Sequence, residues 1–402
     1  MDHHVSAKIL KLRKSSMKYV RTAGGRPMLK MSYTIWCRIF SVTLENIRKG
    51  FEIHDNGIQG ELSTVNASVI QQSAMAMILH LLLLLPLANA LAAPLKSYLI
   101  TGANKGQGLA LCRRILIEYD DTHVFLCSRD ATRGEEAKIS LLDLVCEDRV
   151  DVVPLDVTSE SSVSDALSAV HSCIARRSSS GESPIQLSGV VSNAGILWGY
   201  PLQELLQVCT WGVKRVLDAF VPLLNEQSND GRVVVVTSGL GPLMHQYSGE
   251  ERQQAMMSPE CTWETISSMM DECLGAYEST QDDTLEARIE TFDKIHFPGG
   301  PFADTAPDFH MYGLAKMFGD AYMKVIARKY PALRVTSVDP GLVYTDLILR
   351  MPKYEGKQKE DTTAQSPHEV SWVGFNYHVL MFDSNVMSIL RLGCRGNNEI
   401  AI

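Results

Sequence analysis

Short apolar runs alternate with longer stretches of helical periodicity through the middle of the chain. The apolar runs predict six strands, over 98–100, 124–127, 150–155, 190–191, 233–236 and 334–338. The helical stretches between them predict helices over 107–119, 131–144, 161–176, 201–224 and 309–329. Strands that alternate with helices at this interval indicate an α/β domain with a doubly wound parallel sheet, which we place at 96–348.

The alternation stops at about 240–306. Two acidic helices are predicted there, around 259–277 and 284–295, so this stretch is interpreted as a helical insertion before the helix at 309–329. Beyond residue 348 the pattern weakens. The segment 349–402 is therefore treated as a divergent C-terminal segment, with a polar loop at 353–365 and a weakly periodic helix at 369–381.

The first 93 residues differ from the rest of the chain. Residues 1–74 are basic and weakly patterned, which is typical of a disordered or targeting leader. Residues 75–93 are apolar, long enough to span or contact a membrane, and end in small residues as a cleaved signal does. A membrane anchor, a signal that starts at Met75 or Met77, a buried helix and mistakenly translated upstream sequence all fit this segment.

The location of the main domain follows from the charges around that segment. Lysines shortly after it favour a cytoplasmic location, with or without a membrane anchor. A secretory or plastid route is the alternative if 75–93 is a cleaved signal.

Composition excludes several classes of protein. The 402 residues carry a net charge of −8, which argues against a nucleic-acid surface. The histidines form neither an H-E-x-x-H motif nor a pair four residues apart, so no metal site is expected. Nine cysteines without a C-x-x-C motif indicate reduced, packed thiols in a reducing compartment.

The loop after the first predicted strand has the residues of a phosphate site. Thr101-Gly102-x3-Gly106-x-Gly108 leads a strand into a helix N-terminus, whose free N–H groups and dipole attract a pyrophosphate. Lys105 in this loop and Arg129 at the end of the second strand favour NADP(H) over NAD(H), because a base there neutralises a 2′-phosphate. A solvated arginine is the alternative, since Asp130 follows it.

Three polar side chains are candidates for the chemistry. Tyr312 and Lys316 lie one helical turn apart, so that an ammonium group can favour the phenolate and move the tyrosine pKa towards neutrality. Ser238 closes the predicted strand at 233–236, at the carboxyl edge of the sheet, where ligands of such sheets bind. Taken singly, these residues are typical of a solvated helix face and a turn, but together they predict a site.

These motifs, in this order, resemble the short-chain dehydrogenase/reductase family over about 96–347. The resemblance also rests on Asp156 after the third strand, Asn193-Ala194-Gly195 after the fourth, and Pro340-Gly341 with Thr345 after the sixth. The bend at 101–106 with the segment 128–134 is similar to the NADPH-dependent carbonyl reductases of the family. In that branch an insertion before the tyrosine covers the face used for oligomerisation, which implies a monomer.

The resemblance implies a Rossmann-type domain that reduces a ketone or aldehyde to an alcohol by hydride transfer from NADPH. Tyr312 would give a proton to the carbonyl oxygen, Lys316 would hold the ribose, and Ser238 would bond the substrate oxygen. The implied cofactor-binding residues are Gly102, Asn104, Lys105, Gly106, Gly108, Arg129, Asp156, Val157, Asn193, Ala194, Gly195, Tyr312, Lys316, Pro340, Gly341 and Thr345.

One departure from the family pattern leaves an alternative open. The family usually has an asparagine that helps to hold a proton-relay water where this chain has Cys209, and a thiol cannot replace the bonds of an amide. The alternative is an NADP(H)-binding protein with weak or lost catalysis.

The substrate pocket is expected to be walled by the insertion, by the loop after Gly341 and by Leu197, Trp198 and Tyr200. These walls suit a small apolar carbonyl compound.

Overall fold

The computed structural model describes residues 19–21, 27–29 and 93–367, the last range without 146, 181, 229, 280–286, 288–306, 363 and 365. The chain divides into two compact units, residues 1–81 and 82–402. In the first, β1 (Tyr19–Arg21) pairs antiparallel with β2 (Pro27–Leu29). The apolar segment predicted at 75–93 lies, except for its last residue, outside the described residues, and no helix within the described ranges has the length and apolarity of a membrane span.

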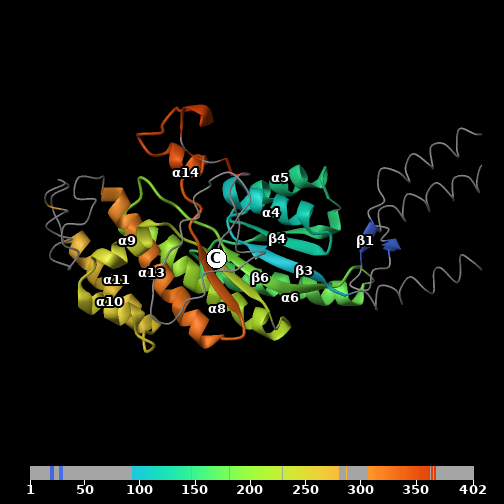
Figure 1. Ribbon diagram of the computed structural model, residues 1–402, viewed down its shortest axis with the longest axis horizontal. Coiled ribbons are helices and arrows are strands. Elements are labelled where there is room, and N and C mark those ends of the chain that lie inside the picture. Colours follow the sequence, from blue (N-terminus) through green and yellow to red (C-terminus); the bar gives the residue numbers. More distant parts are fainter. Residues whose placement is uncertain are drawn as a thin grey trace, which may run out of the picture. The chain divides into compact units, whose positions relative to one another are not determined.

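The second unit is built on one parallel sheet of six strands (Figure 1), in the order β5-β4-β3-β6-β7-β8. The strands are β3 (Leu95–Ile100), β4 (Thr122–Ser128), β5 (Val150–Pro154), β6 (Ile185–Ser192), β7 (Arg232–Val236) and β8 (Arg334–Val338). All six predicted strands are therefore confirmed. β6 begins five residues earlier than predicted, because Ile185 and Leu187 are buried at alternating positions that a short apolar run does not reveal.

Helices cover both faces of this sheet, which confirms the doubly wound fold. Figure 1 shows α4 (Gly106–Glu118) and α5 (Ala131–Leu142) on one side of it, and α6 (Glu160–Ser179) and α8 (Gly212–Gln227) on the other. Neighbouring strand residues point to opposite faces, so β3 contributes Ile100 to the core under α4 and Leu99 to the larger core under α8.

The helix predicted at 201–224 contains an irregular turn. The chain forms α7 (Leu202–Leu206), a π-helical turn η2 (Gln207–Trp211) and then α8 in direct succession. The widened turn lies between the two α-helical parts and contains Cys209. Periodicity predicts the helix but not this turn, because both conformations bury nearly the same side chains.

The insertion contains more helix than predicted. It consists of α9 (Leu240–Tyr247), α10 (Glu250–Met257) and α11 (Trp263–Glu278). The helix predicted at 259–277 corresponds to α11, which begins later because the Thr262 side chain caps it. The shorter α9 and α10 were not predicted, and the helix predicted at 284–295 lies, save for residue 287, outside the described residues.

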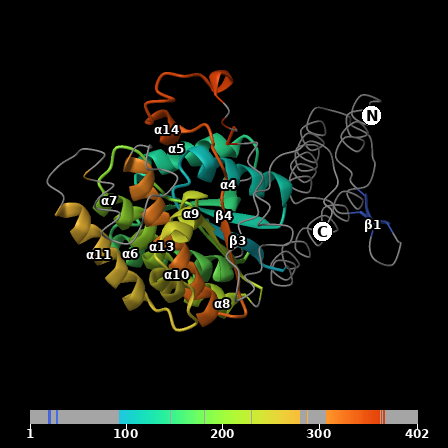
Figure 2. The same cartoon turned by 60° about the vertical axis from the view of Figure 1, so that its left-hand side comes forward.

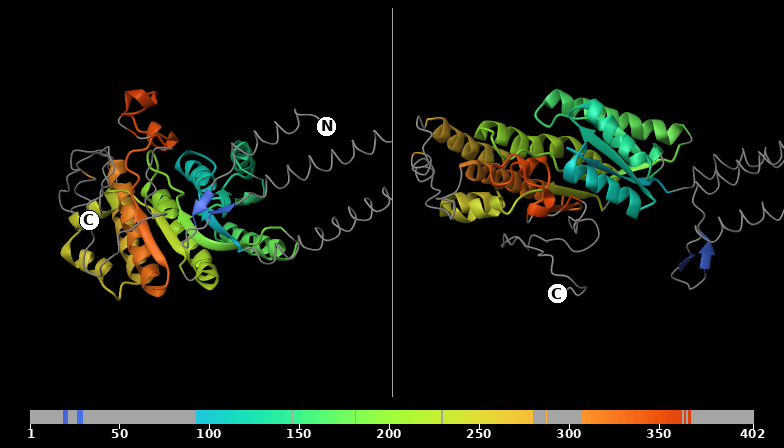
Figure 3. Two further views of the ribbon diagram at one scale, coloured as in Figure 1. Left: turned by 45° about the vertical axis from the view of Figure 1, so that its right-hand side comes forward. Right: turned by 90° about the horizontal axis from the view of Figure 1, so that it is seen from above.

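The insertion lies against the long helix α13 (Pro307–Lys329) (Figures 2 and 3). Contacts of α9 and α11 with α13 place the insertion beside the helix that carries Tyr312 and Lys316. The remaining described elements are short: η1 (Glu147–Arg149), α14 (Asp346–Leu349) and η3 (Lys359–Asp361). The weak helix predicted at 369–381 lies outside the described residues.

Candidate active site

The glycine bend between β3 and α4 requires its glycines. Gly102 and Gly106 have φ angles of +62° and +55°, which other residues rarely adopt. A Cβ added to Gly108 would lie 2.5 Å from the carbonyl oxygen of Gly102 and 2.7 Å from Nδ2 of Asn193. The bend therefore has the close backbone packing that lets a phosphate group approach the N-terminus of α4, with Asn104 half-buried inside it.

The bend is fastened to the loop that follows β6. The Thr101 hydroxyl oxygen accepts hydrogen bonds from the N–H groups of Asn193, at 2.9 Å, and Ala194, at 3.0 Å. The Asn193 amide in turn donates to the carbonyl oxygen of Thr101 at 2.8 Å. Two of the predicted cofactor segments thus lie together between β3 and β6, where the strand order reverses and ligands of such sheets bind.

The end of β4 presents a cation to solvent. Arg129 is exposed, whereas the carboxylate of Asp130 accepts the backbone N–H of Arg133 at 3.1 Å and so caps α5. Lys105 is also exposed, and its ammonium lies 2.6 Å from the carboxylate of Asp346 on α14. The negative charge that follows Arg129 is therefore engaged in local structure.

Two predicted cofactor residues follow β5. Asp156 is half-buried, and its Oδ1 accepts hydrogen bonds from the backbone N–H and the hydroxyl of Thr158. The Val157 side chain is buried, and a Cβ added to Gly212 of α8 would lie 2.9 Å from it. The side chain of Val157 thus belongs to the core, and any contact with a cofactor falls to its backbone.

The loop after β8 closes over the glycine bend. Gly341 has a φ angle of +68°, and its N–H donates to Asp339 at 2.9 Å, which turns the chain just after the half-buried Pro340. Thr345 then lies with its methyl group 3.3 Å from where a Cβ of Gly106 would be. Residues from both ends of the domain therefore lie together at the glycine bend.

Tyr312 and Lys316 are buried next to each other on α13. The ammonium nitrogen of Lys316 lies 5.5 Å from the centre of the Tyr312 ring and donates to the carbonyl oxygen of Val236, at the end of β7, at 2.8 Å. A Cβ on Gly195 would lie 3.8 Å from the same nitrogen. The pair therefore reaches the carboxyl ends of β6 and β7.

The turn that contains Ser238 lies against α13. The serine is half-buried, and its hydroxyl oxygen accepts the N–H of Leu240 at 3.3 Å. The carbonyl oxygen of Leu240 would lie 3.3 Å from a Cβ on Gly313, the residue after Tyr312. The turn that carries the hydroxyl thus adjoins the turn that carries the phenol.

The electrostatics of the pair differ from the expectation. Burial raises the pKa of Tyr312 to about 12, although the neighbouring Lys316 ammonium acts to lower it. Burial lowers the pKa of Lys316, but Tyr312, Cys209 and Asp320 together outweigh it, and the pKa is raised. The sequence predicts a lowered pKa for Tyr312, but in the structure this pKa is raised, so the prediction is wrong. The phenol is protonated at neutral pH, as a proton donor must be.

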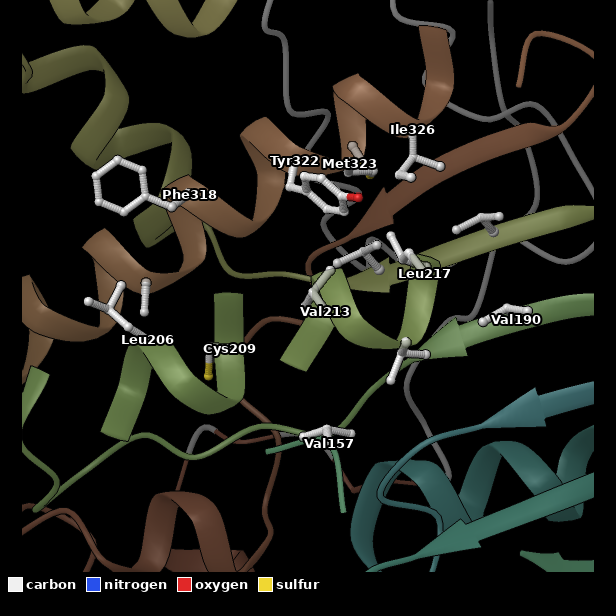
Figure 4. Close-up of a cluster of buried hydrophobic side chains, with 14 of the residues drawn as sticks. Val157, Val190, Leu206, Cys209, Val213, Leu217, Phe318, Tyr322, Met323 and Ile326 are labelled. Carbon is white, nitrogen blue, oxygen red and sulfur yellow. The ribbon is translucent and has the colours of Figure 1, made fainter. Parts of the chain in front are cut away.

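Cys209 lies at the edge of this group, in the π-helical turn. Its thiol lies 3.5 Å from the carbonyl oxygen of Ile196 and would be 3.9 Å from a Cβ on Gly195. Figure 4 shows Cys209 within the buried cluster that α8 and α13 share. The position where the family usually has an asparagine is thus buried beside the candidate site.

The residues predicted to wall the substrate pocket divide into two groups. Leu197 is buried in the main core. The half-buried Trp198 contacts Phe309 edge-on, with ring centres 5.6 Å apart, and the Tyr200 hydroxyl oxygen accepts from Arg350 at 2.5 Å. Tyr200 thereby links the loop after β6 to the segment after β8.

Sequence reasoning missed two residues next to the site. The Thr237 hydroxyl, directly before Ser238, donates to Oδ2 of Asp320 on α13 at 2.8 Å. Asp320 follows Lys316 at the same four-residue spacing that separates Lys316 from Tyr312, so all three lie on one helix face. That repeated spacing is the signal that could have revealed it.

The chain is similar in sequence to known dehydrogenases. A family model described as short chain dehydrogenase matches residues 96–249. Short-chain dehydrogenase/reductase 1 of Saponaria officinalis is 29% identical over 284 residues, which are 66% of this chain and 87% of that protein. The (+)-neomenthol dehydrogenase of Arabidopsis thaliana is 26% identical over 67% of this chain and 91% of its own. The structure of menthone neomenthol reductase from Mentha piperita is 26% identical and covers 62% of this chain and 90% of its own, with a TM-score of 0.49.

Proposed function

Because this chain belongs to the short-chain dehydrogenase/reductase family, we propose that it reduces the carbonyl group of a small ketone or aldehyde to an alcohol with NADPH. Its relatives are named as dehydrogenases and reductases, so the general activity is that of a nicotinamide-dependent oxidoreductase. The observation that carries the finer proposal is the placement of Tyr312 and Lys316 against the strand end that leads to Ser238.

The residues around the glycine bend fit a dinucleotide. The bend at 102–108 leads into the N-terminus of α4, where N–H groups of the first turn can bind a phosphate, and a Cβ on Gly108 would disrupt it by meeting Gly102 and Asn193. When bound, the nicotinamide supplies the hydride. The Ser238 hydroxyl donates a hydrogen bond to the carbonyl oxygen, and the protonated Tyr312 gives its proton to that oxygen as negative charge develops on it. The Lys316 ammonium stabilises the resulting phenolate.

The proposed preference for NADPH rests on charge at the end of β4. Arg129 is exposed there, and Asp130 is occupied as the cap of α5 and lies 3.6 Å from Arg133. A 2′-phosphate at this strand end would therefore meet an arginine, while the neighbouring carboxylate is directed to the first turn of α5.

The side chains around the loop after β6 favour an apolar substrate. Trp198 and Phe309 present aromatic surface, while Tyr200 and Arg350 add a polar edge. Such a lining suits a hydrophobic carbonyl compound with few polar groups.

A second candidate function is binding of NADP(H) with little turnover. The observation that favours it is the buried thiol of Cys209 beside Gly195, since a thiol is a weak donor and a weak acceptor. Both candidates bind the cofactor, but only the first consumes it.

The test is oxidation of NADPH by the purified full chain with a panel of quinones, aldehydes and ketones. Tyr312→Phe is expected to lower kcat about 100-fold or more, because the proton donor is lost. Tyr322→Phe is the matched control, since it removes a phenol from the same helix where that phenol contacts Asp218 and Trp263. NADPH binding without oxidation would support the second candidate, and equal rates for Tyr312→Phe and wild type would refute the first.

A further inference from the structure

Asp320 is a buried carboxylic acid that the proposed mechanism does not use. It is 5% exposed, and its Oδ2 accepts the hydrogen bond from the Thr237 hydroxyl at 2.8 Å. Its other oxygen, Oδ1, has no hydrogen-bond partner among the described residues. A buried polar atom without a partner costs free energy, so it is expected only where the group has a role.

The surroundings of Asp320 join three elements. The end of β7 contributes Thr237, and α13 contributes the carboxylate itself. A Cβ on Gly241 of α9 would lie 2.7 Å from Oδ2, so α9 can approach this closely only because residue 241 is a glycine. The carboxylate thus lies where the strand end, the insertion and the tyrosine-bearing helix meet.

Two consecutive residues of the strand end are held by two residues one turn apart on α13. The carbonyl oxygen of Val236 accepts from Lys316 at 2.8 Å, and the hydroxyl of Thr237 donates to Asp320 at 2.8 Å. The next residue is Ser238. The position of the serine hydroxyl relative to Tyr312 therefore depends on both bonds.

We propose that Asp320 is a positioning residue of the reductase site: its carboxylate fastens the strand end before Ser238 to the helix of Tyr312 and Lys316, and its charge determines how firmly. This inference rests on the proposed function and deepens it. An ionised carboxylate accepts a stronger hydrogen bond than a neutral carboxyl group, so loss of the charge loosens the strand end.

The charge of Asp320 responds to pH near neutrality. Burial raises its pKa to about 7, while the Thr237 hydrogen bond, Lys316 and Lys324 act to lower it, and Asp339 after β8 raises it further. From α9 the facing groups are Gly241, which carries no charge, and His245, which interacts with Lys324. The fastening is therefore firm above pH 7 and weakened below it.

The decisive variant is Asp320→Asn in the full chain, which keeps the shape and an acceptor for Thr237 but has no charge. We expect its kcat to be about tenfold below wild type at pH 8.5 and close to wild type at pH 5.5, since the wild type then carries a neutral group as well. Dividing the kcat of the variant by that of wild type cancels the effect of other groups that titrate in both proteins. A ratio that does not change with pH would overturn the inference.

Two further variants separate the hydrogen bond from the charge. Thr237→Val removes the donor and is expected to lower kcat at pH 8.5 as Asp320→Asn does. Thr237→Ser retains the donor, so its kcat is expected to equal that of wild type. Asp218→Asn is the matched control. It removes a carboxylate of α8 that is hydrogen-bonded to Tyr322, which lies on α13 as Asp320 does. A loss of kcat with Asp218→Asn equal to that with Asp320→Asn would contradict a specific role of Asp320.

The thermal unfolding midpoint gives a readout without substrate. The folded state holds a proton on Asp320 between about pH 4 and 7 that the unfolded chain releases, so the wild type loses stability as pH rises through this range. Asp320→Asn removes this loss, and its midpoint is expected to rise relative to wild type as pH increases. A wild type that oxidises no NADPH would refute the proposed function, while the midpoint still decides whether Asp320 titrates as inferred. Parallel midpoints in the two proteins would overturn the inference.

Discussion

Arg129 is the residue on which the choice of cofactor depends most directly. It is exposed at the end of β4, and the neighbouring carboxylate of Asp130 is occupied by the first turn of α5. We predict that Arg129→Ala raises the KM for NADPH about tenfold and leaves the KM for NADH unchanged, because a charge-assisted bond to the 2′-phosphate is lost. Steady-state kinetics with both cofactors measure this.

The control for that variant is Arg114→Ala. Arg114 is an exposed arginine of α4 that pairs with Glu118. It lies towards the C-terminal end of the helix, away from the glycine bend at its N-terminus. Its removal is expected to change neither KM. Equal KM changes for NADPH and NADH in Arg129→Ala would show that Arg129 does not read the phosphate.

Cys209 distinguishes the two candidate functions. We predict that Cys209→Asn raises kcat several-fold, because an amide can both donate and accept hydrogen bonds where the thiol does so weakly. Cys209→Ser, which replaces the thiol with a hydroxyl group of similar size, serves as the comparison. If Cys209→Asn folds with an unchanged melting temperature and shows no gain in kcat, the thiol does not limit turnover.

Sequence reasoning succeeded where local spacing fixes the geometry. The positive φ angles of Gly102 and Gly106 and the one-turn separation of Tyr312 and Lys316 are set within a few positions, so a pattern reveals them. The long-range hydrogen bonds of Thr101 and Thr237 could not be found in this way. Their hydroxyls bond residues about 80 to 90 positions distant along the chain, and only the fold brings such groups together.

At the scale of elements, the crossing of α9 and α13 determines the geometry of the site. A Cβ on Gly241 would lie 2.7 Å from Asp320 and 3.2 Å from the backbone of Lys316. We predict that Gly241→Ala lowers the free energy of unfolding by about 2 kcal/mol and lowers kcat as well, because the two helices must separate. Denaturant unfolding and steady-state kinetics test both effects.

The matched control is Gly275→Ala in α11. A Cβ there would meet no atom within 4 Å, and the residue is exposed inside a helix. This change is expected to raise the free energy of unfolding by about 0.5–1 kcal/mol, because alanine favours the helix over glycine. Gly241→Ala with the stability and kcat of wild type would show that the crossing tolerates a wider separation.

The alternation of apolar runs and helical periodicity revealed the elements of the sheet but not every irregularity. All six strands were predicted, because buried parallel strands are continuous apolar runs. The π-helical turn at Gln207–Trp211 and the short helices α9 and α10 were not, since each adds only a turn or two whose burial depends on a neighbouring helix, α13 or α11. Tertiary contacts, not local preference, determine these segments.

At the scale of the whole molecule, the insertion covers the outer face of two long helices. Trp263 of α11 contacts Trp211 next to α8, with ring centres 4.5 Å apart, and Tyr322 of α13 at 5.2 Å. The Lys214 ammonium lies 5.2 Å from the Trp263 ring. This aromatic face is therefore already packed against the chain's own insertion.

We predict that the full chain is a monomer in solution, because Trp263 of α11 covers the face that carries Trp211, Lys214 and Tyr322. Light scattering coupled to gel filtration measures the mass directly. Trp263→Asp, which unseats α11, is expected to expose this face and to promote association. A wild-type dimer whose stability does not depend on Trp263 would place the interface elsewhere.

The order of the strands has a consequence for how the protein matures on the ribosome. β3 to β6, with the glycine bend, are complete once the first half of the domain has emerged, whereas β8 pairs with β7 from roughly a hundred residues further along. The phenol and the ammonium are translated within that interval. A product that terminates prematurely inside the insertion would therefore contain the glycine bend but lack α13, β8 and the loop of Thr345, and with them Tyr312 and Lys316.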